Sequence, residues 1–231
     1  MTMIEKNLQT VRARVAAACQ AAGRDRRDVS LLAVSKTFGA DAVAQAHTAG
    51  QTAFGENYIQ EAVEKIIALK HLGVQWHCIG PIQSNKTRLV AEHFDWVHSV
   101  DRLKTAQRLS EQRPADLPPL QVCIQVNADG GASKSGVPPD QALALAQQVA
   151  ALPGLRLRGV MSIPEPAADF AAACAVFAQV KGVFDAMNEA GLALDTLSMG
   201  MSADLEAAIR SGSTMVRVGT AIFGGRSAPG A

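Results

Sequence analysis

Cysteine is scarce in this chain, and its placement argues against two classes of protein. The 231 residues contain four cysteines, Cys19, Cys78, Cys123 and Cys174. No two of them form a Cys-x-x-Cys pair, so their spacing indicates neither a zinc site nor a disulfide framework. We therefore expect no bound metal, and we expect buried free thiols, which are typical of a reducing compartment.

Excess charge and long apolar runs are missing as well. The chain has 22 Lys and Arg residues against 21 Asp and Glu residues, giving a formal net charge of +1. This balance gives no electrostatic reason to expect binding to nucleic acid or to a membrane surface. No run reaches the roughly 18 apolar residues of a transmembrane helix, and charges at Glu5, Lys6, Arg12 and Arg14 interrupt any signal-peptide core. We expect a cytoplasmic protein and, in the absence of a large apolar patch, a monomer.

Short apolar runs alternate with alanine-rich helical segments along the chain. Eight runs predict strands: Ser30–Ser35, Thr52–Phe54, Gln75–Ile79, Trp96–Val100, Leu120–Asn127, Leu155–Met161, Thr196–Met199 and Met215–Val218. The segments after them predict helices: Ala40–Ala49, Ile59–Lys70, Asn85–His93, Arg102–Gln112, Pro139–Ala151, Ala168–Glu189 and Ala203–Ser211. A further amphipathic helix, Met3–Ala22, precedes the first strand.

Strand–helix alternation predicts a parallel sheet, because parallel strands need a crossover connection. Eight such units in about 200–250 residues fit an α/β protein with a single (β/α)8 TIM barrel. The open doubly wound sheet is the alternative, but no Gly-x-Gly-x-x-Gly follows the first strand. We predict one barrel domain over residues 1–231 with an extra N-terminal helix.

Lys36 stands at the carboxyl end of the first predicted strand. The run Leu31–Ser35 is short and apolar, as expected of a fully buried strand. A lysine at the end of such a strand is partly stripped of water, and desolvation favours the neutral amine. Neutral lysine amines form Schiff bases with carbonyl compounds. Lys36 is therefore either such a nucleophile or simply the first solvated residue after the strand.

The loops after the seventh and eighth predicted strands carry small polar residues. Ser202 is expected to be the N-cap of a helix starting near Ala203, and Gly219-Thr220 offers a glycine turn followed by a hydroxyl. Glycine lets the backbone approach an anion, and helix N-termini favour negative charge. In barrels these two loops are the usual phosphate site. The alternative is that Ser202 only caps a helix and Gly219 only makes a turn.

Arg217 lies inside the apolar run Met215–Val218. Buried arginines are rare unless they are paired. Arg217 therefore points either into the site at the strand ends or outward to a helix carboxylate such as Glu206.

Other polar residues receive structural interpretations. His77, within the third strand, is expected to be a core histidine with satisfied hydrogen bonds, and His98 a group at a strand end or on the surface. Glu56 is expected to be a carboxylate at a helix N-terminus. Lys134 is expected to be a solvated charge in a loop. We predict no catalytic residue among them.

Five segments of the chain resemble one family. They are Ala33–Thr37, Phe54–Tyr58, Trp76–Lys86, Ser198–Asp204 and Val216–Gly224. In sequence and in order they are similar to the motifs of the YggS/PROSC family of pyridoxal 5'-phosphate (PLP) homeostasis proteins. The resemblance spans essentially the whole chain, so it is highly specific.

The resemblance implies a barrel like the N-terminal domain of alanine racemase, with PLP held as a Schiff base on Lys36. It further implies that Ser202, Gly219 and Thr220 hold the phosphate and that Arg217 faces the pyridine nitrogen. Because an arginine does not give up its proton, that nitrogen stays unprotonated and the cofactor is a poor electron sink.

The same resemblance places Asn57 near the cofactor ring. Family members are regarded as carriers in vitamin B6 homeostasis with little or no catalytic activity, and apo forms of PLP-dependent enzymes are the expected recipients. Alanine racemases take a second acid–base tyrosine from an added β-domain. This sequence continues only to Ala231 after the eighth strand, and its one tyrosine, Tyr58, has no match to that residue.

Two other functions stay open from the sequence. A weak PLP-dependent amino-acid racemase would need a second proton acceptor, which the motifs do not identify. A lysine aldolase acting on a sugar phosphate would bind no PLP and would need an acid–base pair beside Lys36.

Overall fold

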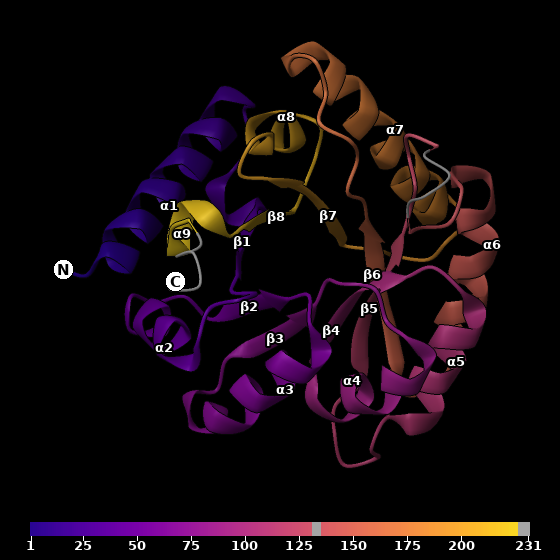
Figure 1. The fold of residues 1–231 in the computed structure, drawn as a ribbon. Coiled ribbons are helices and arrows are strands. Elements are labelled where there is room, and N and C mark those ends of the chain that lie inside the picture. Colours follow the sequence, from indigo (N-terminus) through magenta and orange to yellow (C-terminus); the bar gives the residue numbers. More distant parts are fainter. Residues whose placement is uncertain (131–134, 226–231) are drawn as a thin grey trace.

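Eight parallel strands close into a barrel in the order of the chain (Figure 1). The computed structural model describes residues 1–130 and 135–225. The strands are β1 Ser30–Val34, β2 Ala53–Glu56, β3 Gln75–Cys78, β4 Trp96–Val100, β5 Leu120–Gln125, β6 Leu155–Met161, β7 Thr196–Met201 and β8 Met215–Val218. Strand β1 pairs with both β2 and β8, which closes the ring. The predicted barrel is confirmed, and the open sheet is wrong.

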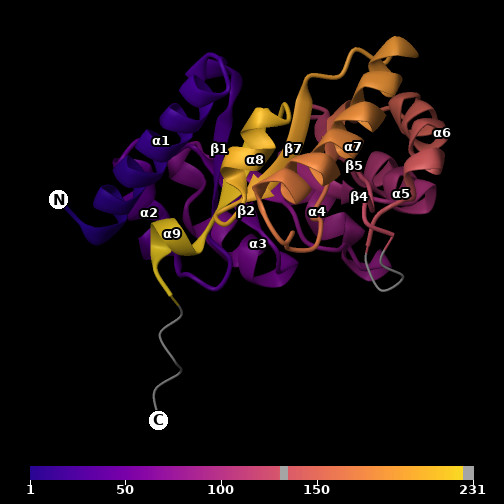
Figure 2. The same ribbon diagram turned by 90° about the horizontal axis from the view of Figure 1, so that it is seen from above.

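The helices lie outside the strands (Figure 2). They are α1 Met3–Ala21, α2 Ala40–Thr48, α3 Ile59–Ala68, α4 Thr87–His93, α5 Leu103–Gln112, α6 Pro139–Ala150, α7 Phe170–Glu189, α8 Leu205–Arg210 and α9 Thr220–Phe223, with short 3₁₀ helices at Arg26–Asp28, Lys70–Leu72 and Ser84–Lys86. Because the helices cover the outer face, the strands are buried on both sides and their sequences are apolar almost without interruption.

Helix α1 takes the position that an eighth outer helix would occupy. Among the residues described, the helix after β8 is the four-residue α9, and α1 lies between α8 and α2 on this side of the barrel (Figures 1 and 2). Its buried residues Ile4, Leu8, Val11 and Val15 recur every three or four positions. This spacing forms one apolar stripe, so α1 closes the outer layer over β1 and β8.

Helix α7 is the one helix, among the residues described, long and apolar enough to cross a membrane by composition. Its buried residues follow the same helical spacing: Ala173, Phe177, Val180, Phe184 and Met187. This stripe packs on the outside of β6 and β7. The apolar composition of α7 is therefore that of an outer barrel helix with alanines on its exposed side.

The barrel interior contains both apolar and polar side chains. Two small apolar clusters line it: Leu32, Val34, Ile79 and Met215 form one, and Trp96, Cys123 and Met161 form the other. The remaining inner positions include buried His77, His98, Ser198 and Arg217. Since buried polar groups need partners, these four side chains form a hydrogen-bonded network, described below.

The four cysteines are free, as predicted. Cys19, Cys78 and Cys123 are buried, and Cys174 is partly buried. Burial raises the pKa of Cys78 and of Cys123 to about 12. These two thiols are consequently protonated at neutral pH and are inert packing groups.

Candidate functional site

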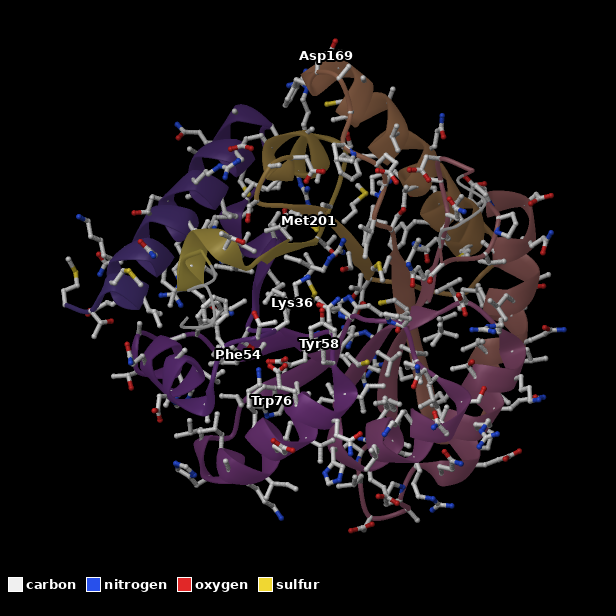
Figure 3. The ribbon with its side chains drawn as sticks, in the orientation of Figure 1. Lys36, Phe54, Tyr58, Trp76, Asp169 and Met201 are labelled. Carbon is white, nitrogen blue, oxygen red and sulfur yellow. The ribbon has the colours of Figure 1, made fainter. Side chains whose placement is uncertain are left out.

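Lys36 lines a cavity of about 320 Å³ at the carboxyl ends of β1, β7 and β8. The backbone reverses immediately after β1, where the Phe38 N–H donates to the Ser35 carbonyl at 3.1 Å. In Figure 3, Lys36 lies inside the ring of strands, Met201 lies on that ring beside β7 and β8, and Asp169 lies at the rim of the molecule. Within the residues described, the Lys36 amine has no hydrogen-bond or ion-pair partner, so it is available in the cavity.

Ser202 lines the same cavity but does not cap a helix. Strand β7 continues to Met201, and α8 begins only at Leu205 with Asp204 as its N-cap residue. The Asp204 carboxylate accepts from the Met201 N–H at 2.6 Å and closes the intervening turn. The predicted N-cap role is therefore wrong, because Asp204 fixes a turn that delays the helix. The Ser202 hydroxyl is left at the cavity wall.

Gly219 and Thr220 form the part of the cavity wall that follows β8. A Cβ atom at Gly219 would lie 3.1 Å from the Val34 carbonyl oxygen, tighter than most contacts of this kind. Glycine therefore lets the backbone after β8 run close against β1. Thr220 is exposed at the start of α9, and among the residues described its hydroxyl has no protein partner to lose when it reaches a bound group.

Arg217 points inward, as one of the two sequence interpretations required. Its guanidinium is buried and donates to Ser198 Oγ at 2.7 Å and to the Ser162 carbonyl at 2.9 Å. The proposed outward partner, Glu206, instead pairs with Arg14 of α1, with Nη2 2.7 Å from Oε2. Burial lowers the pKa of Arg217 to about 10, which still leaves it cationic at neutral pH. It lines the cavity together with Lys36.

A neutral hydrogen-bonded chain continues from Arg217 into the barrel. His98 Nδ1 lies 2.9 Å from Ser198 Oγ, and His98 Nε2 lies 2.9 Å from His77 Nδ1. An arginine only donates, so the Ser198 hydroxyl is free to donate onward to His98. In the reverse ordering the Ser198 hydroxyl hydrogen would have no acceptor among the residues described. This assigns the protons of both imidazoles to Nε2.

Burial keeps both histidines neutral. It lowers the pKa of His77 to about 3. It also lowers the pKa of His98 far below its ordinary value, and the neighbouring His77 and the Arg217 cation act in the same direction. His98 is thus a barrel-interior residue, and its predicted place at a strand end or on the surface is wrong. His77 is a core histidine as predicted, but its Nε2 has no partner among the described residues.

Glu56 is also misplaced by the sequence interpretation. It is the last residue of β2, fully buried on the outer face of the barrel, and not a carboxylate at a helix N-terminus. Lys65 of α3 donates to Glu56 Oε1 at 2.8 Å and contacts Glu61 Oε1 at 2.7 Å. Burial raises the pKa of Glu56, although Lys65 and a hydrogen bond from Ser35 oppose the shift.

Asn57 lies in an adjacent hollow. This hollow, about 370 Å³, is lined by Asn57 and Gln125, and Met201 borders both it and the cavity of Lys36. The Asn57 Oδ1 atom is buried and has no partner in the part of the chain that the structure describes. Lys134 falls in 131–134, outside the described residues.

A larger cavity, about 610 Å³, opens at the other end of the barrel near Ser30 and Gln75. Its arginines already have partners: Arg158 pairs with Asp195 at 2.7 Å, and Arg27 pairs with Asp25 at 2.7 Å. In the part of the chain that the structure describes, none of its lining residues is a lysine. The smaller cavity is therefore the candidate site, since it holds five of the six side chains and backbone positions predicted from sequence.

Two residues of the site region escaped the sequence interpretation. Lys65 continues the buried stripe of α3 that includes Ala62 and Ile66. A lysine inside an apolar stripe was a signal for a buried charge partner. Ser198 lies within β7 and gives no such signal, because a serine carries no charge that would require a buried partner of opposite sign.

The fold and the cavity define a class of protein, namely barrels of the alanine racemase type. The family model described as alanine racemase, N-terminal domain, matches residues 6–227. Alanine racemase from Corynebacterium glutamicum superposes with a TM-score of 0.69 at 19% identity, covering 97% of this chain and 61% of that one. At this identity the likeness shows the fold alone.

Other relatives share more of the sequence and therefore identify the family. The pyridoxal phosphate homeostasis proteins of Pseudomonas aeruginosa and Escherichia coli are 62% identical over 226 residues and 53% identical over 229 residues, covering 98% of this chain and 97% and 98% of theirs. PipY from Synechococcus elongatus, solved with PLP bound, has a TM-score of 0.83 at 36% identity, covering 96% of this chain and all 100% of PipY. This chain belongs to the family of pyridoxal phosphate homeostasis proteins.

Proposed function

We propose that this protein binds PLP through a Schiff base on Lys36 and serves PLP homeostasis with little or no catalysis of its own. One observation carries the proposal. A lysine amine, an arginine cation and the hydroxyl-bearing loops after β7 and β8 line a single cavity of about 320 Å³. A relative with 36% identity has been solved with PLP bound, which supports the same ligand here.

The residues of the cavity fit the chemical parts of PLP. Ser202, Gly219 and Thr220 offer hydroxyls and an approachable backbone for the phosphate. The Lys36 amine suits the aldehyde, and the inward Arg217 suits the pyridine nitrogen. When bound, PLP supplies the electrophilic aldehyde and a ring that withdraws electrons from an attached amine.

Asn57 has a separate supporting role. Its buried and unpartnered Oδ1 marks a polar position in the neighbouring hollow, which meets the cavity at Met201. We assign Asn57 to the edge of the ring, where this oxygen can accept a hydrogen bond. A buried acceptor without a partner is costly, so occupation of the site would satisfy it.

The electrostatics of Arg217 support a carrier over a catalyst. Arg217 is cationic at neutral pH even though burial lowers its pKa to about 10. A permanent donor leaves the pyridine nitrogen unprotonated, which weakens the ring as an electron sink. A cytoplasmic, monomeric single-domain carrier that supplies PLP to apo-enzymes is the function we infer. A weak amino-acid racemase is the alternative.

The test is the visible absorption spectrum of the purified protein with added PLP, followed by borohydride reduction and peptide mass mapping. We expect a yellow protein with the pyridoxyl group on Lys36. Lys36→Ala should lose the covalent adduct and retain part of the PLP non-covalently through the phosphate-binding residues. Lys70→Ala, which changes an exposed lysine, serves as the matched control and should behave as the unchanged protein.

Two results would redirect the proposal. A colourless protein that takes up no PLP would overturn it and favour a lysine aldolase. Loss of optical activity from an added L-amino acid, abolished by Lys36→Ala, would replace the carrier with the racemase.

A further inference from the structure

The two peptide groups that flank Lys36 are both held by side chains outside the cavity. Ser35, the residue before it, donates its hydroxyl to Glu56 Oε1 at 2.6 Å, and its carbonyl accepts from Lys65 Nζ at 2.9 Å. Thr37, the residue after it, donates its N–H to Glu61 Oε1 at 2.9 Å. The chain on either side of Lys36 is therefore fixed by one cluster of charged residues.

This cluster constrains a turn that is unfavourable for its sequence. The Ser35–Phe38 turn has Lys36 and Thr37 as its central residues, and Thr37 has a φ of 68°. This left-handed conformation suits glycine or asparagine and is strained for a β-branched residue such as threonine. The contact from Glu61 holds Thr37 in this conformation, which in turn sets the direction in which Lys36 leaves the backbone.

The three charged residues form a compact group between β2 and α3. Lys65 Nζ lies 2.8 Å from Glu56 and 2.7 Å from Glu61, and the side chains of Glu56, Lys65 and Glu61 are 0%, 6% and 37% exposed. Buried ion pairs contribute little net stability compared with apolar packing of the same volume. The hydrogen bonds from this group to Ser35 and Thr37 indicate a role in conformation.

We propose that Lys65, Glu56 and Glu61 are positioning residues that fix the turn around Lys36 and aim its amine at the aldehyde of the ligand. The inference rests on the proposed function, because the direction of the Lys36 side chain matters only if its amine reacts with the aldehyde of PLP. None of the three lines the cavity itself, so they act through the backbone of Ser35 and Thr37.

The test separates formation of the covalent bond from occupation of the cavity. Glu61→Ala removes the acceptor for the Thr37 N–H, Glu61→Gln retains an amide oxygen there, and Glu64→Ala changes an exposed glutamate of the same helix as control. For each variant, the rate of borohydride-trappable adduct on Lys36 is measured with PLP. The affinity for 4-deoxypyridoxine 5'-phosphate, which lacks the aldehyde, is measured in parallel.

We expect Glu61→Ala to slow adduct formation about tenfold or more, because a small misplacement of a reacting group can cost two orders of magnitude. Affinity for the aldehyde-free analogue should stay within about twofold of the unchanged protein, and Glu61→Gln should recover much of the rate. Glu64→Ala should alter neither quantity. Lys65→Met, which also releases the Ser35 carbonyl, should slow the adduct further.

Several outcomes would overturn the inference. Unchanged adduct formation in Glu61→Ala would show that Lys36 needs no such support. An equal loss of analogue affinity and adduct rate would indicate a merely structural role. If Lys65→Met does not fold, the Glu61 pair of variants still decides the question. Absence of any Lys36 adduct in the unchanged protein would instead defeat the proposed function, and analogue binding distinguishes that case.

Discussion

Lys36 and Arg217 line one cavity, yet the polar groups that support them differ in charge. The support beside Lys36 is ionic and lies on the outer face of the barrel, where Lys65 meets two carboxylates. The support behind Arg217 is neutral and lies inside the barrel, where Ser198 and two histidines follow one another. The two networks therefore hold neighbouring functional groups by different electrostatic means.

The difference follows from what each location already contains. The outer network has Glu56 and Glu61 to balance the ammonium of Lys65, and Glu61 still reaches solvent. The barrel interior holds the cation of Arg217, and within the residues described no carboxylate contacts it. A second positive charge there would meet both desolvation and repulsion. The interior network accordingly uses groups that hydrogen-bond without ionising, and this limits it to hydroxyl and neutral imidazole.

We expect the largest loss of folding stability when the cation of the ionic network, Lys65, is replaced. Lys65→Met leaves the fully buried carboxylate of Glu56 without its cationic partner. Removal of one member of a buried pair destabilises by about 3–5 kcal/mol, which urea unfolding at neutral pH would measure. Lys70→Met, at an exposed position, should change the free energy of unfolding by less than about 0.5 kcal/mol.

Adding Glu56→Gln to Lys65→Met should recover part of the lost stability. If Lys65→Met unfolds with the unchanged midpoint, the cluster is not a buried ionic network in solution.

The neutral network inside the barrel should make the stability of the folded protein depend on pH. Burial depresses the pKa of His77 to about 3 and that of His98 in the same direction. Below the ordinary histidine value near 6.5, the unfolded chain takes up protons that the folded protein does not. Stability is therefore present above about pH 6.5 and lost as the pH falls, by about 1.4 kcal/mol per pH unit for each histidine.

His98→Asn tests this slope directly. Urea unfolding at about pH 6 and about pH 5 should show a shallower loss of stability than in the unchanged protein, by roughly one proton. His71→Asn, which removes an exposed histidine, is the matched control and should keep the full slope. A slope that His98→Asn leaves unchanged would mean that His98 titrates in the folded barrel.

The smallest effect is expected at an ionic contact that water reaches. Arg14 of α1 pairs with Glu206 of α8, and their side chains are 37% and 41% exposed. Arg14 also donates to the Ser202 carbonyl at 2.7 Å. Exposed pairs contribute about 1 kcal/mol or less, so Arg14→Met should cost no more than that, and added salt should reduce the difference. A loss comparable to that of Lys65→Met would show that exposure does not distinguish the two ionic networks.

The sequence predicted the positions of the site groups because a barrel brings every strand end to one face. Alternation of apolar runs and helices was enough to place Lys36 and Gly219 at that face but left the direction of Arg217 open, and the structure has all three at one cavity. The five motifs predicted the family, which the relatives confirm. The positions of residues at strand ends depend mainly on the topology of the sheet. The pattern of strands and helices in the sequence predicts that topology.

The supporting residues could not be predicted in the same way. Glu56 and Lys65 meet only when α3 packs on β2, and His98 and Ser198 are 100 residues apart in the chain. Local pattern also failed at Ser202, where the side chain of Asp204 displaces the start of the helix by two residues. Such contacts depend on how side chains of different helices and strands meet in space. The spacing of apolar residues along the sequence does not predict this.

The fixed order of hydrogen bonds behind Arg217 has an electrical consequence. Every donor in the sequence Arg217, Ser198, His98, His77 points away from the guanidinium, so each dipole turns its negative end toward that cation. Reversing the order would require a hydroxyl rotation and two tautomer shifts at once. The hydrogen-bonded groups inside the barrel are thus already oriented around Arg217 before any ligand arrives. Because the negative ends stabilise the Arg217 cation, the guanidinium can meet an anion or lone pair in the cavity without any rearrangement of these groups.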